Sequence, residues 1–179
     1  MQTQAQQEVW LRGPIPAITP LLQPAAHALL QAMEEIRKYT APLNDKLIWE
    51  RPAGLASVAF HLQHLVGVLD RLFTYAEENQ LNEEQLAYLK NEGVFKDSIT
   101  LSALMLALEE KISWSVGKLE SFPPAILTDT RYVGRNKIPS TVIGLLFHAA
   151  EHTQRHTARS LQRLKYWPGN PGPENIFYV

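Results

Sequence analysis

Histidine is the residue type in this chain whose number and spacing point most directly to chemistry. Five of the six histidines fall in two short segments. The segment FHLQHL contains His61 and His64, and the segment HAAEHTQRH contains His148, His152 and His156. Neutral imidazole is a common protein ligand for zinc, nickel and similar ions. The two clusters therefore predict a metal site.

The members of the second cluster are four residues apart, which places them on one face of a helix. Two ligands from that helix and one from a facing helix would leave one coordination position open, as is typical of catalytic metal sites. The spacing alone does not choose three ligands out of five. The alternative is a metal-free bundle in which these histidines form a buried hydrogen-bonded cluster. The isolated His27 is expected to be a surface or hydrogen-bonded residue.

Glu151 lies inside the sequence HAAEH, which matches the H-x-x-E-H motif of inverted zinc proteases. Those enzymes need a further acidic ligand well downstream, and only 27 residues follow His152. We therefore do not expect a protease of this class. Glu151 stays a candidate acid–base group or a residue that supports a ligand, and the alternative is a solvated carboxylate on a helix face.

Apolar periodicity and capping residues predict the helices that must position these side chains. Four long helices are expected over residues 25–39, 58–77, 100–120 and 140–167, and a short one begins after Asn82. Ser57 and Ser140 are the expected N-cap residues of the second and fourth long helices. The second helix carries an apolar seam typical of a bundle: Val58, Leu62, Leu65, Leu69, Leu72 and Ala76.

The remaining segments are predicted to flank this helical body. Residues 1–24 contain four prolines, so we expect an extended arm rather than one regular helix, with Trp10 and Leu11 as its anchors on the body. The body should occupy residues 25–167 and the C-terminal tail residues 168–179. In the loop after the first helix, three apolar side chains are expected to pack inward: Leu47, Ile48 and Trp49.

Sustained alternation of apolar and polar residues is missing outside short loop pieces such as residues 130–133. Four long helices without a credible sheet predict an all-α fold, namely a four-helix bundle. A long crossover should join its second and third helices and carry the short extra helix.

Composition excludes several classes of function. Seventeen basic and eighteen acidic side chains give a net charge of −1, which argues against a nucleic-acid partner. The chain has no cysteine, so disulfides, zinc–thiolate sites, iron–sulfur clusters and cysteine nucleophiles are excluded. No apolar run approaches the ~18 residues of a membrane helix, and the first residues, MQTQAQQ, do not predict a signal peptide. We expect a cytoplasmic protein without a membrane partner.

From about Leu21 to Trp167 the sequence resembles the DinB family of damage-inducible-like four-helix proteins. The stretches ASVAFHLQHLVGVLDRLFTYA and PSTVIGLLFHAAEHTQRH carry the resemblance, together with the helix order and the long middle crossover. It implies an up-down-down-up bundle and a divalent ion, zinc or nickel, held by His64, His152 and His156. His148 would then support a ligand. The apolar seam of the second helix favours His61 over His64 instead, so His61 is the alternative ligand.

The family includes bacterial bacillithiol and mycothiol S-transferases, so the resemblance implies a metal-dependent transferase or hydrolase-like enzyme that uses a low-molecular-weight thiol or another small molecule. The alternative is a non-catalytic metal-binding or stress-associated bundle. Family members have a Gly-Gln pair after the last ligand, where this chain has Ala158 and Arg159. Arg159 is a candidate to pair with a carboxylate of the thiol or substrate, in a pocket near Phe60 and Phe147. Homodimer formation is left open.

Overall fold

The computed structural model describes the backbone of residues 7–165 and the side chains of residues 7–160. Five α-helices make up most of this region: α1 (Gln23–Thr40), α2 (Val58–Ala76), α3 (Glu83–Asn91), α4 (Leu101–Leu119) and α5 (Val142–Lys165). The prediction of a mainly helical fold is therefore confirmed. The predicted helix end at Trp167 and the tail 168–179 lie outside the described residues.

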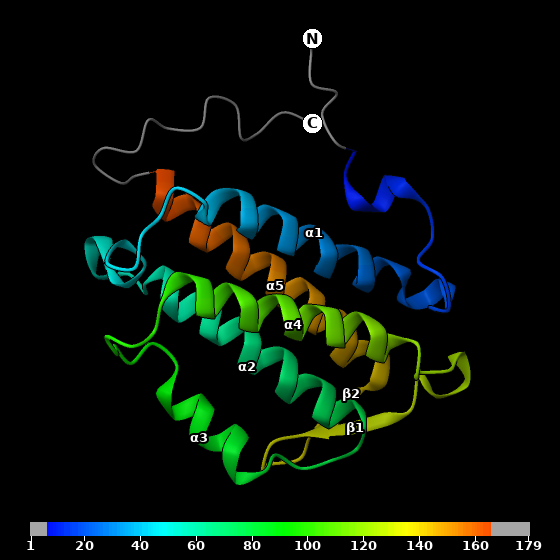
Figure 1. Cartoon of the computed structure of the whole chain (residues 1–179). Helices are drawn as coiled ribbons and strands as arrows, with labels where there is room; N and C mark the ends of the chain where they lie inside the picture. The colour runs from blue at the N-terminus through cyan, green and yellow to red at the C-terminus, as the bar shows by residue number, and fades with distance from the viewer. Residues whose placement is uncertain (1–6, 166–179) are drawn as a thin grey trace.

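The four long helices pack side by side around one core (Figure 1). α1 contacts α4 and α5, and α2 contacts the same two helices. α1 and α5 run in one direction along the molecule, and α2 and α4 run in the other. The short helix α3 lies in the connection between α2 and α4 and packs on α2.

The apolar seam expected for α2 is buried along its whole length, and Leu65, Leu69 and Phe73 have no exposed surface. The ends of this helix and its neighbours follow local sequence signals. The side chains of Ser57 and Thr100 accept hydrogen bonds from backbone N–H groups in the first turns of α2 and α4. Asn82 and Gln85 form a capping box at the start of α3. Local capping and core burial thus agree on where these helices begin.

A two-stranded antiparallel sheet precedes α5, which corrects the expectation of a fold without strands. Strand β1 (Thr130–Val133) pairs with β2 (Ile138–Thr141), with Thr130 opposite Thr141. The residues between the strands include Gly134 and Lys137, whose positive φ angles allow the tight reversal. Four residues per strand are too few to distinguish from a loop in the sequence.

The start of α5 also differs from the prediction, because strand β2 occupies the residues where the helix was expected to begin. Ser140 lies in β2 and is not the N-cap of the helix, which begins at Val142. Thr141 takes the capping role, because its hydroxyl oxygen accepts a hydrogen bond of 3.1 Å from the N–H of Gly144.

The N-terminal arm also differs from the prediction. It contains two short 3₁₀ turns, Val9–Arg12 and Pro20–Leu22, within the described residues. Trp10 and Leu11 are 60% and 51% exposed, so they do not anchor the arm. The anchors are Val9, Ile18 and Leu22, which are all buried. In the loop after α1, Ile48 is fully buried, and Leu47 and Trp49 are half-buried.

No single helix in the described part of the chain is long and apolar enough to span a membrane. One sharply bent pair, Leu47–Gly54 with Val58–Ala76, meets the length and composition criteria jointly.

Candidate metal centre

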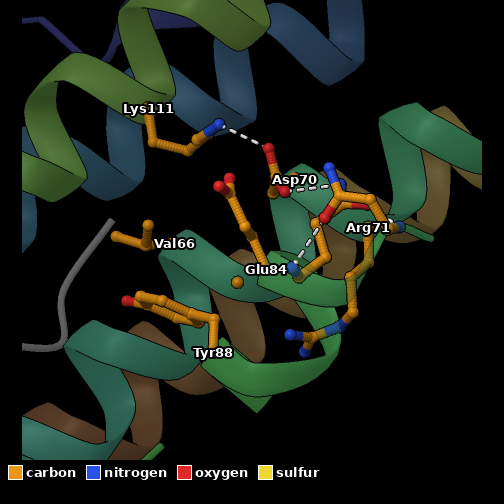
Figure 2. A pocket seen from close by; sticks show the side chains of 9 residues that line it. Val66, Asp70, Arg71, Glu84, Tyr88 and Lys111 are labelled. Carbon is orange, nitrogen blue, oxygen red and sulfur yellow. Dashed lines mark hydrogen bonds and ion pairs between the residues drawn. The ribbon is translucent and has the colours of Figure 1, made fainter.

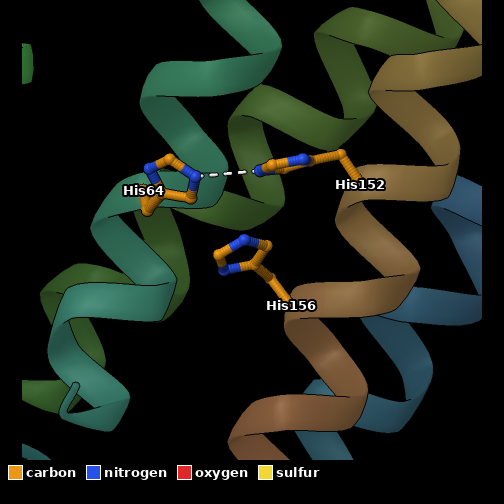
Figure 3. A group of neighbouring side chains, drawn as sticks. All are labelled: His64, His152 and His156. Atoms are coloured by element: carbon orange, nitrogen blue, oxygen red, sulfur yellow. Dashed lines mark hydrogen bonds between the residues drawn. The ribbon is translucent and has the colours of Figure 1, made fainter. Parts of the chain in front are cut away.

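Three histidines from two helices meet between α2 and α5. His64 comes from α2, and His152 and His156 come from α5 (Figure 3). Each contributes one ring nitrogen to a group whose members lie within 4.8 Å of one another. The Nε2 atoms of His64 and His152 are 2.9 Å apart. A set of three imidazole nitrogens this close together can hold a metal ion.

The helical spacing explains how the three rings reach one point. His152 and His156 are one turn apart on α5, and their rings stack with centroids 4.4 Å apart. α2 packs directly against α5, and His64 lies next to the buried seam of α2. His64 retains 18% of its side-chain exposure, whereas His156 is buried. The group therefore lies at the edge of the core, with the His64 side partly open to solvent.

In two of these histidines, His64 and His156, the Nδ1 atom contacts a residue outside the group. Nε2 is then the nitrogen left for the group. Nδ1 of His64 lies 2.7 Å from Oε2 of Glu92. Nδ1 of His156 lies 2.9 Å from Nδ1 of His61. His61 therefore contacts a member of the group from the core side and is not itself a member. Nδ1 of His152 is buried and has no hydrogen-bond partner among the described residues.

Burial keeps two of the rings neutral. Burial, followed by the charge of nearby His64, lowers the pKa of His152 to about 4 and that of His156 to about 3. Both imidazoles are then uncharged at neutral pH. A metal ligand must be in this state, because a protonated nitrogen has no lone pair to donate.

We expect the metal-free protein to lose stability as the pH falls from about 6.5 to 5. In that window the unfolded chain protonates histidines at their ordinary pKa, whereas folded His152 and His156 stay neutral. The unfolded state binds more protons, so the free energy of unfolding decreases with falling pH. The slope per group is at most ~1.4 kcal/mol per pH unit, and solvent screening reduces it.

Urea denaturation of chelator-treated protein across this range measures the slope. The variant His152→Gln should show a shallower dependence of stability on pH than the native protein. The variant His148→Ala should show the same dependence as the native protein, because His148 is exposed. A native slope of zero between pH 6.5 and 5 would contradict the assignment of neutral rings.

The other predicted site residues lie around the group. The His148 ring is 5.2 Å from that of His152, and its Nδ1 is 3.5 Å from Glu151. Glu151 accepts two hydrogen bonds from Arg155, which lower the pKa of the carboxyl. Arg159 is exposed and close enough to His156 for its charge to lower the pKa of that ring.

Of the two aromatic residues of the predicted pocket, Phe60 contacts the histidine group and Phe147 is exposed to solvent. The Phe60 ring stacks on the His64 ring, with centroids 5.3 Å apart and planes inclined by 12°. Phe147 is 62% exposed. The isolated His27 lies 3.0 Å from the carbonyl oxygen of Gly13, which agrees with a hydrogen-bonded surface residue.

Glu92 is the member of this site that the sequence analysis missed. It follows α3, 28 residues after His64, and its side chain is 4% exposed. It also forms an ion pair with Arg71 of α2. In the sequence Glu92 follows an exposed helix that contains two other acidic residues, Glu83 and Glu84, and no periodic or motif signal separates it from them.

The geometry fits a metal ion. Tetrahedral coordination with metal–nitrogen bonds of ~2.0–2.1 Å places ligand nitrogens about 3.3 Å apart. The Nε2 atoms of His64 and His152 are 2.9 Å apart, so they need to move apart only slightly to reach that distance. Three neutral nitrogen donors suit zinc, nickel and similar divalent ions.

A comparison with protein families agrees with this arrangement. The profile of the DinB superfamily matches residues 20–159, which is most of the chain. The chain belongs to the DinB superfamily. The match includes all three histidines of the group, Glu92 and Arg71, so the site lies inside the region shared with the superfamily. No curated protein sequence matches the chain.

Proposed function

We propose that this member of the DinB superfamily binds one divalent ion, zinc or nickel, through His64, His152 and His156 in an up-down-down-up four-helix bundle. We propose further that it is a metal-dependent enzyme that transfers a low-molecular-weight thiol to a small electrophile, or hydrolyses a small molecule. The convergence of three imidazole nitrogens at the edge of the core carries the proposal.

When bound, a divalent ion supplies a Lewis acid with an open coordination position, which lowers the pKa of a thiol or water. The protein supplies the remaining conditions. Three neutral ligands leave the positive charge of the ion uncompensated, so an anionic partner is favoured there. Phe60 covers one face of His64 and limits water on that side. The partial exposure of His64 leaves a path for a small substrate.

Arg159 is the proposed contact for the carboxylate of a thiol or substrate. It lies three residues after His156 on α5 and is exposed. A guanidinium can bind a carboxylate with two parallel hydrogen bonds, and this geometry suits a ligand anchored beside a metal. Arg155 lowers the pKa of Glu151, so the carboxylate stays ionised and its role would be to accept a hydrogen bond.

A non-catalytic metal-binding bundle is the second candidate. The observation that favours it is the placement of the ligands on α2 and α5, because one ion would join two helices far apart in the sequence. Such an ion stabilises the folded state without any turnover. Homodimer formation is compatible with both candidates.

Turnover of a thiol with an electrophile separates the two candidates. We expect metal-loaded native protein to consume a low-molecular-weight thiol together with an alkylating electrophile, and His64→Ala to lose this activity. Arg159→Ala should retain metal but raise the KM for a carboxylate-bearing thiol roughly tenfold or more, as expected for a lost charged hydrogen bond. Stoichiometric metal without turnover of any thiol or hydrolysable ester would favour the non-catalytic bundle.

A further inference from the structure

The His64 ring is fixed by residues of the crossover between α2 and α4. Its Nδ1 lies 2.7 Å from Oε2 of Glu92. Its face stacks on Phe60, and Phe60 in turn packs against Gly93. A side chain at Gly93 would place its Cβ 2.8 Å from Phe60, and the φ of +80° also favours glycine there. The crossover thus contacts the edge of one proposed ligand directly through Glu92 and supports Phe60 of α2, which covers its face.

Glu92 is itself held in one orientation. Oε1 accepts a hydrogen bond of 2.7 Å from Nη1 of Arg71, while Oε2 is the atom next to His64. The side chains of Glu92 and Arg71 are only 4% and 10% exposed. The carboxylate therefore uses one oxygen for each partner in a setting with little solvent.

Arg71 forms its ion pair with Glu92 rather than with the neighbouring Asp70. It lines a cavity of about 370 Å³ between α2, α3 and α4 that also contains Asp70 (Figure 2). Asp70, however, is bonded to Lys111 and Gln85. Figure 2 shows the Arg71 guanidinium extending away from Asp70 and Lys111. Lys111 and Asp70 therefore form one ion pair, and Arg71 and Glu92 form a separate one.

Gly67 allows this pair to lie against α2. A Cβ at this position would overlap Oε1 of Glu92 and lie 2.6 Å from Nη1 of Arg71. Glycine inside a helix is less favourable than alanine. The close approach of the Glu92–Arg71 pair gives a physical reason for glycine in the middle of α2.

We propose that Glu92 is a positioning residue that sets the tautomer and orientation of His64 for metal binding, an inference that rests on the proposed function. A carboxylate paired with arginine only accepts hydrogen bonds, so Nδ1 of His64 must donate. A neutral imidazole carries one proton, and Nε2 is then left with a lone pair facing Nε2 of His152. Arg71 fixes which oxygen of Glu92 faces His64.

The variant Glu92→Gln tests this with little change in shape. Arg71 only donates, so the amide oxygen must face Arg71 and the NH₂ group must face His64. Nδ1 of His64 then has to accept, and its proton moves to Nε2, where it blocks the metal. We expect ¹⁵N NMR of the metal-free variant to show the inverted tautomer, and chelator competition to show a roughly 10- to 100-fold weaker zinc affinity.

The double variant Glu92→Gln with Arg71→Met provides the rescue. Without Arg71 the amide turns, its oxygen accepts from Nδ1 of His64, and the native tautomer and most of the affinity return. Glu77→Gln is the matched control, because Glu77 pairs with Lys118 and is outside the histidine group. It should leave both measurements unchanged.

The outcomes separate this inference from the proposed function. If the native protein binds zinc and Glu92→Gln keeps both the native tautomer and the native affinity, the inference is overturned and the metal site stands. Weakened binding without a tautomer change, or without rescue in the double variant, would show a general structural role and also overturn it. If the native protein binds neither zinc nor nickel, the proposed function fails, and the NMR result alone decides whether Glu92 sets the tautomer.

Discussion

His152→Ala is expected to remove the bound ion almost completely. Nε2 of His152 faces Nε2 of His64 directly, and its ring stacks on that of His156, so its loss leaves two imidazoles and water. Structural zinc sites bind with about 10–16 kcal/mol, or roughly 3 kcal/mol per ligand, so one lost ligand weakens binding on the order of 100-fold. Elemental analysis after dialysis and chelator competition measure occupancy and affinity.

Two further histidine variants serve as controls for this loss. His148→Ala should keep the ion, because His148 is largely exposed and lies outside the group. His61→Ala should also keep it, with a modest loss of affinity from the missing contact to His156. Unchanged occupancy in His152→Ala would contradict the ligand assignment. Loss of metal in His61→Ala together with retention in His64→Ala would make His61 the ligand from α2.

Saturating metal is expected to raise the thermal unfolding midpoint of the native protein by about 8–16 °C. Free ion at a thousandfold excess over Kd stabilises the folded state by ~4 kcal/mol, and a chain of this size gains about 2–4 °C per kcal/mol. The stabilisation arises because the ion joins α2 to α5 only in the folded chain.

Scanning calorimetry with added zinc and with a chelator measures the shift. His152→Ala should show little or none of it, which separates site binding from adventitious binding to surface groups. An equal shift in the native protein and in His152→Ala would contradict the prediction, because the stabilisation would then come from elsewhere.

The long helices could be predicted from the sequence because their periodicity and caps are local. The seam of α2 and the residues Ser57, Asn82 and Thr100 each act within a few positions of the chain. The four-residue spacing of His152 and His156 is equally local, and it predicts that both rings lie on one face of a helix. Choosing His64 over His61 required the family resemblance, because the apolar seam alone favours the more buried His61.

The features that could not be predicted depend on contacts between distant segments. Glu92 becomes part of the site only because α3 packs on α2 and its end meets His64 and Arg71. Ser140 resembles a cap, but pairing with Arg131 draws it into β2 and transfers the cap to Thr141. In the arm, the 3₁₀ turn directs Val9 inward and leaves Trp10 exposed.

X-ray absorption at the metal edge of the purified, metal-loaded native protein tests the central claim most directly. We expect one ion per chain with three imidazole nitrogens at ~2.0–2.1 Å and a light-atom ligand from solvent in the remaining position. A metal-to-chain ratio near zero after loading, or a bound ion whose spectrum shows fewer than three imidazole ligands, would contradict the assignment of His64, His152 and His156 as its ligands.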